Sequence, residues 1–270
     1  MLTEDEIEAR HVTAVEIARQ AGMHALRLFR TKMRFELKSG DELVTEADRA
    51  IELLIRSELR KHWPEDGLFG EEFRGSIDGS VSWIIDPIDG SNNYSSGIAH
   101  WCVSIALMYN RGFALGVIFD PCHDELYSAI AGKGAWLNNI PLLCRPLAAV
   151  RGSVIGFGLT QKIEASGTLE VLARLAAAGA TFRAQGAGGL TIAQIATGRL
   201  DAFFEELIFI WDVAAAVIIL RESGGEAYYC FDPEKPTNGF AFVAVRAGLS
   251  PRLIEALPAE FAGKLGSSNL

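Results

Sequence analysis

Two stretches near the start of the chain have hydrophobic residues at alternating three- and four-residue steps. This spacing places the residues on one face of a helix, and it predicts one helix over residues 7–29 and a second over residues 51–59. Thr45 and Asp48 precede the second stretch with the Ser/Thr-x-x-Asp/Glu spacing of a capping box, and Pro64 follows it. We therefore expect the second helix to begin near Thr45 and to end before Pro64.

Beyond residue 64 the hydrophobic pattern changes to short apolar runs, which are typical of strands. One run stops abruptly at Asp86-Pro87, and Asn110-Arg111-Gly112 has the composition of a tight turn between two further runs. The turn predicts a hairpin. Strands are expected over residues 68–69, 81–85, 101–109, 113–119 and 125–130.

From about residue 151, strand-like and helix-like patterns alternate. Strands are predicted over residues 153–157, 201–205 and 240–245, and helices over residues 169–178, 190–197, 212–223 and 251–257. The stretch from Pro141 to Pro146 is the best candidate boundary, so we expect two mixed α/β halves, residues 1–145 and 146–270. Periodicity alone therefore indicates a mixed α/β protein without an internal repeat.

Composition narrows the classes of protein to consider. Hydrophobic residues make up 49% of the 270 residues, which is too many for a disordered chain. The 34 acidic residues outnumber the 25 basic ones, giving a formal charge of −9, so we expect no binding to nucleic acid, which depends on Lys and Arg. The four cysteines form no C-x-x-C pair, the start of the chain is acidic where a signal peptide is basic, and no apolar run is long enough to span a membrane. We expect a cytoplasmic protein without disulfides or membrane contact.

The strongest chemical signal is the segment Asp86-Pro87-Ile88-Asp89-Gly90-Ser91, which follows a predicted strand. Pro87 fixes a φ angle and Gly90 permits a conformation that other residues resist, so the segment is predicted to be a rigid turn. Such a turn can aim both carboxylates and the Ile88 carbonyl at one point, and oxygen ligands of this kind suit a hard cation such as Mg²⁺. The residues from Gly90 onward could open a helix whose free amides bind an anion such as phosphate.

A surface turn is the alternative interpretation of this segment, because Asp, Pro and Gly are ordinary turn residues. Average residue frequencies place D-P-x-D-G-[ST] by chance in roughly one chain of this length in a few thousand, which favours a functional site. Glu71, Glu72 and Asp212 are further acidic candidates for that site. Their spacing alone leaves open whether Glu71 and Glu72 are solvated and whether Asp212 only caps a helix.

Taken in chain order, these residues carry a family resemblance. The motifs are the segment from Lys38-Ser39 to Asp48, Glu71, the segment 86–91, Trp211-Asp212-Val213-Ala214-Ala215 and Glu222-Ser223-Gly224-Gly225. As a set they resemble the inositol monophosphatase family, whose members are lithium-sensitive, magnesium-dependent phosphomonoesterases. The resemblance covers nearly the whole chain. It implies an α+β fold, the layered αβαβα sandwich of the sugar phosphatases, with the metal cluster between the two halves.

The resemblance also implies two to three Mg²⁺ ions. The expected ligands are Glu71, Asp86, the Ile88 carbonyl, Asp89 and Asp212. Asp86 would be shared between a first ion, which Glu71 and Ile88 also hold, and a second ion held with Asp89 and Asp212. A third ion would lie near Glu71 and Lys38, bound through water.

The expected catalytic residues are Asp48, Ser91 and Glu71. By resemblance, Asp48 and Ser91 position and deprotonate the attacking water, and the amides of Gly90 and Ser91 contact the phosphate. Asp48 has two possible roles, helix capping and catalysis, and the neighbouring motifs favour catalysis.

Substrate contacts are expected at Gly90, Ser91, Gly188, Glu205 and Asp212. Glu205 matches the family's glutamate that binds a ring hydroxyl, although a surface carboxylate is the alternative and Glu206 is an equally acidic neighbour. The segment 186–189 departs from the family's usual Gly-Ser-Ala-Ala by its extra glycines. Ring specificity therefore stays open.

The resemblance implies hydrolysis of inositol monophosphate, or of a similar sugar or polyol phosphate, by direct attack of water. The same site chemistry would serve a phosphatase for histidinol phosphate, fructose 1,6-bisphosphate, NADP or a 3′-phosphoadenosine nucleotide. A regulatory protein that uses a phosphatase fold to bind a partner is the alternative from another class. A homodimer is expected from the resemblance.

Overall fold

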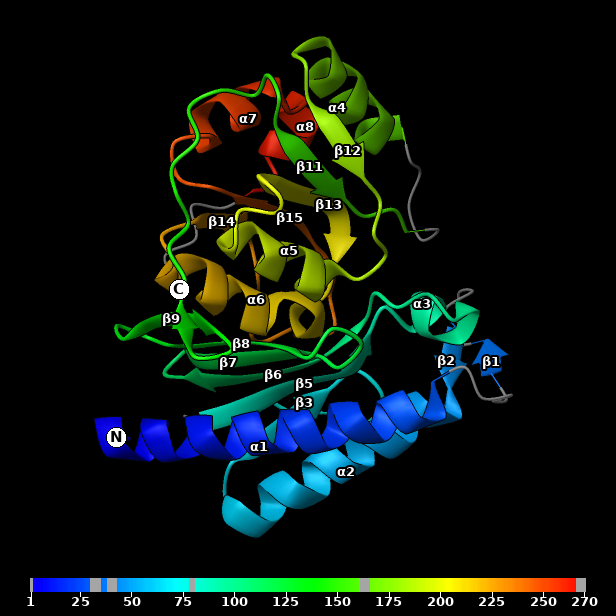
Figure 1. Cartoon of the computed structure of the whole chain (residues 1–270), viewed down its shortest axis with the longest axis vertical. Helices are drawn as coiled ribbons and strands as arrows, with labels where there is room; N and C mark the ends of the chain where they lie inside the picture. Colours follow the sequence, from blue (N-terminus) through cyan, green and yellow to red (C-terminus); the bar gives the residue numbers. More distant parts are fainter. Residues whose placement is uncertain (1, 30–34, 38–42, 78–80, 161–165, 266–270) are drawn as a thin grey trace.

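The computed structural model describes residues 2–29, 35–37, 43–77, 81–160 and 166–265. Its elements stack in five layers, in the order helix, sheet, helix, sheet, helix (Figure 1). The αβαβα sandwich expected from the family resemblance is therefore confirmed. β1 (Phe35–Leu37) and β2 (Leu43–Thr45) pair with each other as a separate small sheet.

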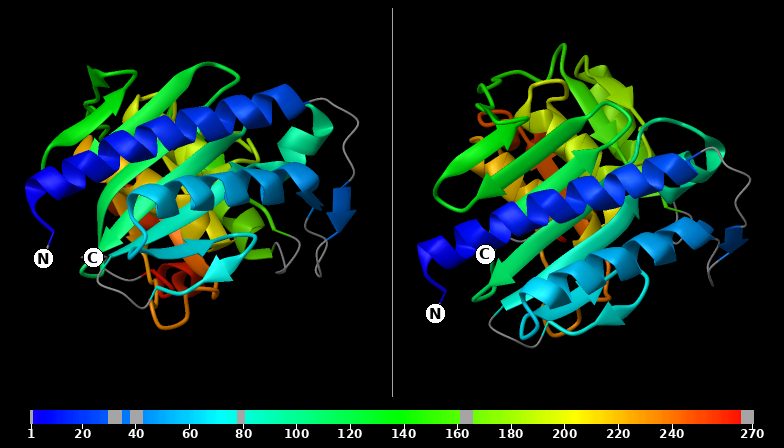
Figure 2. Two further views of the ribbon diagram at one scale, coloured as in Figure 1. Left: turned by 90° about the horizontal axis from the view of Figure 1, so that it is seen from below. Right: turned by 60° about the horizontal axis from the view of Figure 1, so that its bottom comes forward.

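Two long helices form the first layer. α1 (Glu4–Leu28) starts at a capping box, in which the Thr3 hydroxyl accepts a hydrogen bond from the Glu6 amide and the Glu6 carboxylate accepts one from the Thr3 amide. α2 (Glu46–His62) lies beside α1 across the larger sheet, as Figure 2 shows from two sides. Both helices predicted from the hydrophobic spacing are confirmed.

The larger sheet has eight strands in the spatial order β10-β9-β8-β7-β6-β5-β3-β4. β3 and β5 are parallel, whereas β6 and β7 form the antiparallel hairpin that was predicted around residues 110–112. The strands are β3 (Gly67–Gly70), β4 (Arg74–Gly75), β5 (Val81–Asp89), β6 (Cys102–Tyr109), β7 (Gly112–Asp120), β8 (Glu125–Ile130), β9 (Gly134–Leu137) and β10 (Ile140–Pro141).

The end of β5 differs from expectation. The strand that was predicted to stop at Asp86-Pro87 continues to Asp89, so these residues belong to the strand and are not a free turn. The pairing with β6 shifts register between Asp86, opposite Ser104, and Asp89, opposite Cys102. A bulge of this kind accommodates proline, which has no amide to donate, and redirects the side chains around it. The proline therefore marks an irregularity inside the strand.

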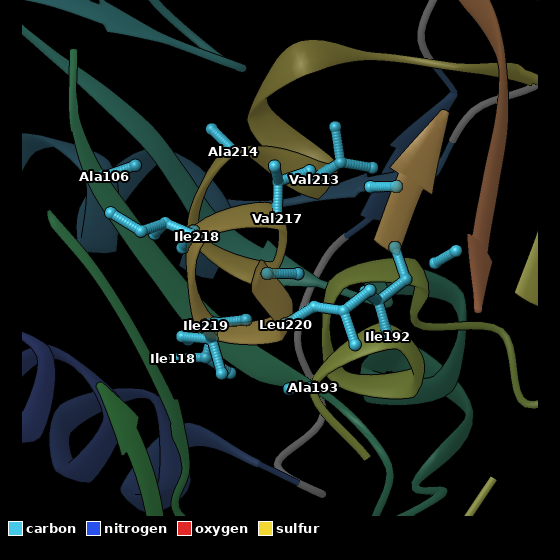
Figure 3. Packing of buried hydrophobic residues seen from close by; sticks show 14 of the residues in the cluster. Ala106, Ile118, Ile192, Ala193, Val213, Ala214, Val217, Ile218, Ile219 and Leu220 are labelled. Carbon is cyan, nitrogen blue, oxygen red and sulfur yellow. The ribbon is translucent and has the colours of Figure 1, made fainter. Parts of the chain in front are cut away.

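The middle layer consists of α5 (Gly188–Ala196) and α6 (Ile210–Glu222), which pack on each other and on strands of the larger sheet. Figure 3 shows Val213, Val217 and Ile218 of α6 among buried side chains from α5 and from the larger sheet. A helix that is apolar on nearly all sides has to be buried on all sides. The sequence of α6 therefore accounts for its central place.

The smaller sheet covers the other side of the middle layer, with strands in the order β12-β11-β13-β15-β14. Its strands are β11 (Val154–Phe157), β12 (Thr181–Arg183), β13 (Ala202–Ile208), β14 (Glu226–Tyr229) and β15 (Phe240–Val245). The outer helices are α4 (Ser166–Ala177), α7 (Ser250–Ala256) and α8 (Ala259–Ala262). β12 and β14 were not predicted, because neither short segment has an extended apolar run.

The two sheets fall on either side of the predicted boundary between Pro141 and Pro146. The larger sheet ends with β10 at Pro141, and the smaller sheet begins with β11 at Val154. α5 and α6 from the second half share one hydrophobic core with strands of the first half, so the division into halves stays a prediction. All four cysteines are free. No described helix has the length and apolarity needed to cross a membrane.

Candidate active site

A polar cavity of about 240 Å³ lies where the ends of β3 and β5 meet the starts of α5 and α6. α3 (Ser91–Ser96) begins at the same place, on the side of the molecule where it is labelled in Figure 1. The predicted site residues that line the cavity are Glu71, Asp86, Ile88, Asp89, Gly90, Ser91, Gly188, Glu205 and Asp212. The fold thus brings together residues that are up to 141 positions apart, as the family resemblance implied.

A larger depression of about 880 Å³ lies elsewhere in the second half of the chain. Glu170, Glu206 and Cys230 are among the residues that line it. The lining includes none of the predicted site residues, so the smaller cavity is the candidate site.

The bulge in β5 sets the directions of Asp86 and Asp89. Asp86 Oδ1 accepts a hydrogen bond from the Ile88 amide at 3.0 Å, whereas Asp86 Oδ2 is buried and has no hydrogen-bond partner among the described residues. Asp89 Oδ2 accepts a hydrogen bond from the Leu190 amide at 2.9 Å. A buried carboxylate oxygen without a donor is costly, because desolvation is not compensated. Asp86 Oδ2 is therefore a ready ligand atom for a cation.

Burial and mutual repulsion act on these carboxylates together. Desolvation raises the pKa of Asp86 well above its usual value, and the negative charges of Glu71, Asp89 and Asp212 raise it further. Desolvation also raises the pKa of Asp89, to about 6, and the hydrogen bond from the Leu190 amide opposes this increase. Desolvation and the charge of Glu71 also raise the pKa of Asp212. The cavity therefore favours a bound positive charge.

Asp212 has both of the roles considered from the sequence, as a helix cap and as a residue of the cavity. It is the third residue of α6, where its Oδ2 accepts a hydrogen bond from the Phe209 amide at 2.8 Å. It also lines the cavity. Helix capping and a place in the site are thus compatible, because a carboxylate has a second oxygen available.

Asp48 reaches the site through Ser91. It is fully buried on α2, and its Oδ1 accepts a hydrogen bond from Ser91 Oγ at 2.6 Å. Gly90 precedes α3 with φ of 93°, a left-handed conformation that glycine adopts without strain and that turns the chain from β5 into α3. The predicted pairing of Asp48 with Ser91 is therefore present. The side chain of Thr45 and all of Lys38 lie outside the described residues, so the capping box and the third ion stay predictions.

The glycines at 188 and 189 allow close packing at the cavity floor. Backbone hydrogen bonds from Gly188 and Gly189 lower the pKa of Asp89, alongside the one from Leu190. A Cβ atom on Gly189 would lie 2.5 Å from the Asp212 carbonyl oxygen and 3.2 Å from Asp89 Oδ2. The start of α5 therefore supports Asp89 directly. A contact between Gly188 and substrate stays a prediction.

Asn93 is a site-supporting residue that the sequence analysis missed. Its Nδ2 donates to the His100 carbonyl and to the Gln185 carbonyl, each at 2.7 Å. These bonds tie α3 to the loop before Gly188, 92 positions away. The only sequence signal was its place directly after the 86–91 segment, which does not reveal a partner so distant.

Glu205 and Glu206 are consecutive residues of β13, so their side chains point to opposite faces of the strand. Glu205 lines the candidate cavity, and burial raises its pKa to about 8 even though part of its surface faces the opening. Glu206 instead accepts a hydrogen bond from Thr168 Oγ1 at 2.9 Å and lines the larger depression. Of these two glutamates, only Glu205 can therefore contact a ligand in the candidate cavity.

The donor set of the cavity fits a hard cation. Among the residues that the structure describes, no three His, Cys, Asp or Glu side chains form a ready-made metal site. The fit rests on the chemistry of the donors, which are carboxylate and carbonyl oxygens, and on Asp86 Oδ2, which has no hydrogen-bond partner among the described residues.

Comparison with known proteins agrees with this geometry. The profile of the inositol monophosphatase family matches residues 6–260. The chain belongs to this family. Its members are phosphatases that use metal ions.

Relatives within the inositol monophosphatase family carry two kinds of name. Nus factor SuhB of Xylella fastidiosa is 36% identical over 222 residues, covering 80% of this chain and 79% of its own length. Nus factor SuhB of Escherichia coli is 34% identical over 219 residues, covering 78% of this chain and 82% of its own. Inositol-1-monophosphatase of Rhizobium meliloti is 34% identical over 230 residues, covering 83% and 86%.

Solved structures in the family have the same fold. The extragenic suppressor protein SuhB of Bartonella henselae superposes with a TM-score of 0.87 at 30% identity, covering 93% of this chain and 99% of its own. SaIMPase-II of Staphylococcus aureus, bound to inositol monophosphate, superposes with a TM-score of 0.76 at 26% identity, covering 91% and 92%.

We predict opposite effects on stability for the same substitution at two buried aspartates. In a buffer with a chelator, Asp86→Asn should raise the unfolding temperature by about 2–4 °C, because it removes one of several repelling carboxylates. Asp201→Asn should lower the unfolding temperature, because Asp201 Oδ1 is paired with Arg246 at 2.7 Å. Calorimetry of both variants measures the difference. Equal losses would show that repulsion in the cavity is negligible.

Proposed function

We propose that the protein is a Mg²⁺-dependent phosphomonoesterase that hydrolyses inositol monophosphate or a similar sugar or polyol phosphate. The observation that carries the proposal is the cavity itself, which five acidic side chains line together with Ser91, the hydrogen-bond partner of Asp48. One of the five, Asp86, has a buried Oδ2 without a hydrogen-bond partner among the described residues. The volume of the cavity is below the ~300–1,000 Å³ of sites for drug-sized ligands, which favours a small, polar substrate.

The residues that would hold Mg²⁺ are Glu71, Asp86, the Ile88 carbonyl, Asp89 and Asp212. When bound, Mg²⁺ ions neutralise phosphate charge, activate water and stabilise a leaving alkoxide. Asp86 is central to this set, because it is repelled by the other three carboxylates and its Oδ2 has no donor within the described ranges of the chain.

Asp48 and Ser91 are placed to move one proton. Ser91 Oγ donates a hydrogen bond to Asp48 Oδ1 at 2.6 Å, which is shorter than its 3.0 Å contact with the Ile88 carbonyl. The Oγ lone pairs can therefore accept a hydrogen bond from a water in the cavity. As the water oxygen attacks phosphorus and the ester P–O bond breaks, the proton of the water passes to Ser91 Oγ while the Ser91 proton passes to Asp48. The leaving alkoxide takes a proton from solvent.

Glu205 is the proposed contact for a substrate hydroxyl. Its carboxyl lies in the cavity, and its raised pKa, about 8, allows it to be either donor or acceptor near neutral pH. Inositol monophosphate bound to SaIMPase-II supports this substrate class. Histidinol phosphate, fructose 1,6-bisphosphate, NADP and 3′-phosphoadenosine nucleotides are the alternatives that a substrate panel would separate.

With inositol 1-phosphate as substrate, we expect phosphate release that depends on Mg²⁺ and is lost in Asp86→Asn. The amide cannot replace the carboxylate as a shared ligand, so the loss in kcat should exceed about 100-fold. Circular dichroism should show an intact fold, and Asp201→Asn is the control that keeps activity. Near-normal turnover by Asp86→Asn would refute the site.

Glu205→Gln should raise KM for inositol 1-phosphate roughly fivefold, because the amide does not reproduce the donor and acceptor positions of the carboxyl and one hydrogen bond contributes about 1 kcal/mol. Glu206→Gln is the matched control, since its side chain lies outside the cavity. Steady-state kinetics measure KM for both variants and for the wild type. The same KM in Glu205→Gln and the wild type would remove Glu205 from the substrate site.

A regulatory role is the second candidate function, and the names of the SuhB relatives favour it. If this chain acts as a Nus factor, it should replace Nus factor SuhB in Escherichia coli cells that lack it. Asp86→Asn should then complement as well as the wild type, provided that the regulatory role needs no phosphatase activity. Growth of the two strains measures this, and failure of the wild type to complement would exclude the role in that organism.

A further inference from the structure

One face of α2 contains a line of polar residues at four-residue steps, Asp48, Glu52 and Arg56. Asp48 belongs to the proposed active site through its bond to Ser91. Glu52 and Arg56 do not line the cavity, and nothing in the proposed mechanism uses them. Figure 2 shows α2 alongside the edge of the sheet where β3 and β4 lie.

Glu52 is a fully buried carboxylate. Its hydrogen-bond partners are backbone amides of one turn and the side chain of one arginine. Glu52 Oε2 accepts a hydrogen bond from the Glu72 amide at 2.6 Å, and Oε1 accepts one from the Phe73 amide at 3.3 Å. Arg56 Nε donates to Oε1 at 2.7 Å. The turn between β3 and β4 is thus wrapped around the end of the Glu52 side chain.

Arg56 and Gly70 close this arrangement. A second nitrogen of Arg56, Nη2, donates to the Arg74 carbonyl on β4, so the guanidinium joins the carboxylate to the far side of the turn. A Cβ atom on Gly70 would lie 2.1 Å from Glu52 Oε1. The carboxylate therefore occupies the space that any other residue at position 70 would need.

Glu71 lies between these contacts. Its amide donates to the Ile85 carbonyl at 3.1 Å, directly before Asp86, and the next two amides bind Glu52. Its backbone is thus held by β5 on one side and by Glu52 on the other. We propose that Glu52, neutralised by Arg56, is a positioning residue that fixes Glu71 for cation binding, an inference that rests on the proposed function.

A purely structural role is the competing explanation. A buried ion pair contributes little net stability compared with apolar residues of the same volume. The partners of Glu52, however, are the two amides that directly follow Glu71, and its helix also provides Asp48. One rigid helix therefore sets the positions of a proposed metal ligand and of the proposed proton acceptor.

The test compares Glu52→Gln with Asp66→Asn. Asp66 also has a buried carboxylate, which is paired with Arg10 at 2.9 Å. Asp66 directly precedes the first residue of β3, whereas Glu71 directly follows the last residue of that strand. Mg²⁺ binding is followed by titration calorimetry, with the unfolding temperature and kcat for inositol 1-phosphate measured in parallel. We expect Glu52→Gln to weaken Mg²⁺ binding about 10- to 100-fold, whereas Asp66→Asn lowers the unfolding temperature and leaves Mg²⁺ affinity unchanged.

The outcomes separate this inference from the proposed function. If the wild type does not bind Mg²⁺, both fail. If the wild type binds Mg²⁺ and Glu52→Gln binds it equally well, only the positioning role is overturned. If Glu52→Gln does not fold, Arg56→Met is tested in its place. This substitution removes the cation beside Glu52 and the hydrogen bond to the Arg74 carbonyl. Unchanged Mg²⁺ affinity in Arg56→Met would also overturn the inference.

Discussion

Repulsion among buried carboxylates is the constraint on which the rest of the site depends. Asp86 is buried among the negative charges of Glu71, Asp89 and Asp212, and no single element could hold these groups so close. Each one comes from a different element or from the bulge in β5, and each is held by backbone amides or by its own turn. The stability of the two sheets and of the apolar middle layer therefore keeps the repelling groups together.

The backbone supplies most of the compensation for this repulsion. The start of α5 directs amides at Asp89, and the start of α6 directs the Phe209 amide at Asp212. Helix N-termini carry partial positive charge, so both helices favour the ionised carboxylates that they approach. Asp86 differs from these two, because its Oδ2 accepts no hydrogen bond from the part of the chain that the structure describes. The site is therefore prepared for one more positive charge, at Asp86.

Prediction from the sequence is accurate where the signal is local or carried by ordered motifs. Helical spacing predicted α1 and α2, and nine residues that the motifs singled out line one cavity. It was wrong about the end of β5, because Pro87 indicates a strand end unless the partner strand is known to tolerate a bulge. Asn93 and Glu52 were missed for a related reason. Their partners are backbone groups at distant positions, which no side-chain pattern reveals.

The acidic composition has a definite meaning in this setting. A formal charge of −9 should repel a phosphate ester, yet the cavity contains several of the surplus carboxylates, where a bound cation reverses the local potential. Elsewhere, the shielded carboxylates of Asp66, Asp201 and Glu52 are each paired with an arginine. The buried Asp120 is paired with His123. A carboxylate beside an arginine needs no metal, whereas Asp86, Asp89 and Asp212 lie close enough for their charges to repel one another. The grouping of carboxylates beside one another, rather than the net charge, is what distinguishes the proposed cation-dependent site from an ordinary acidic surface.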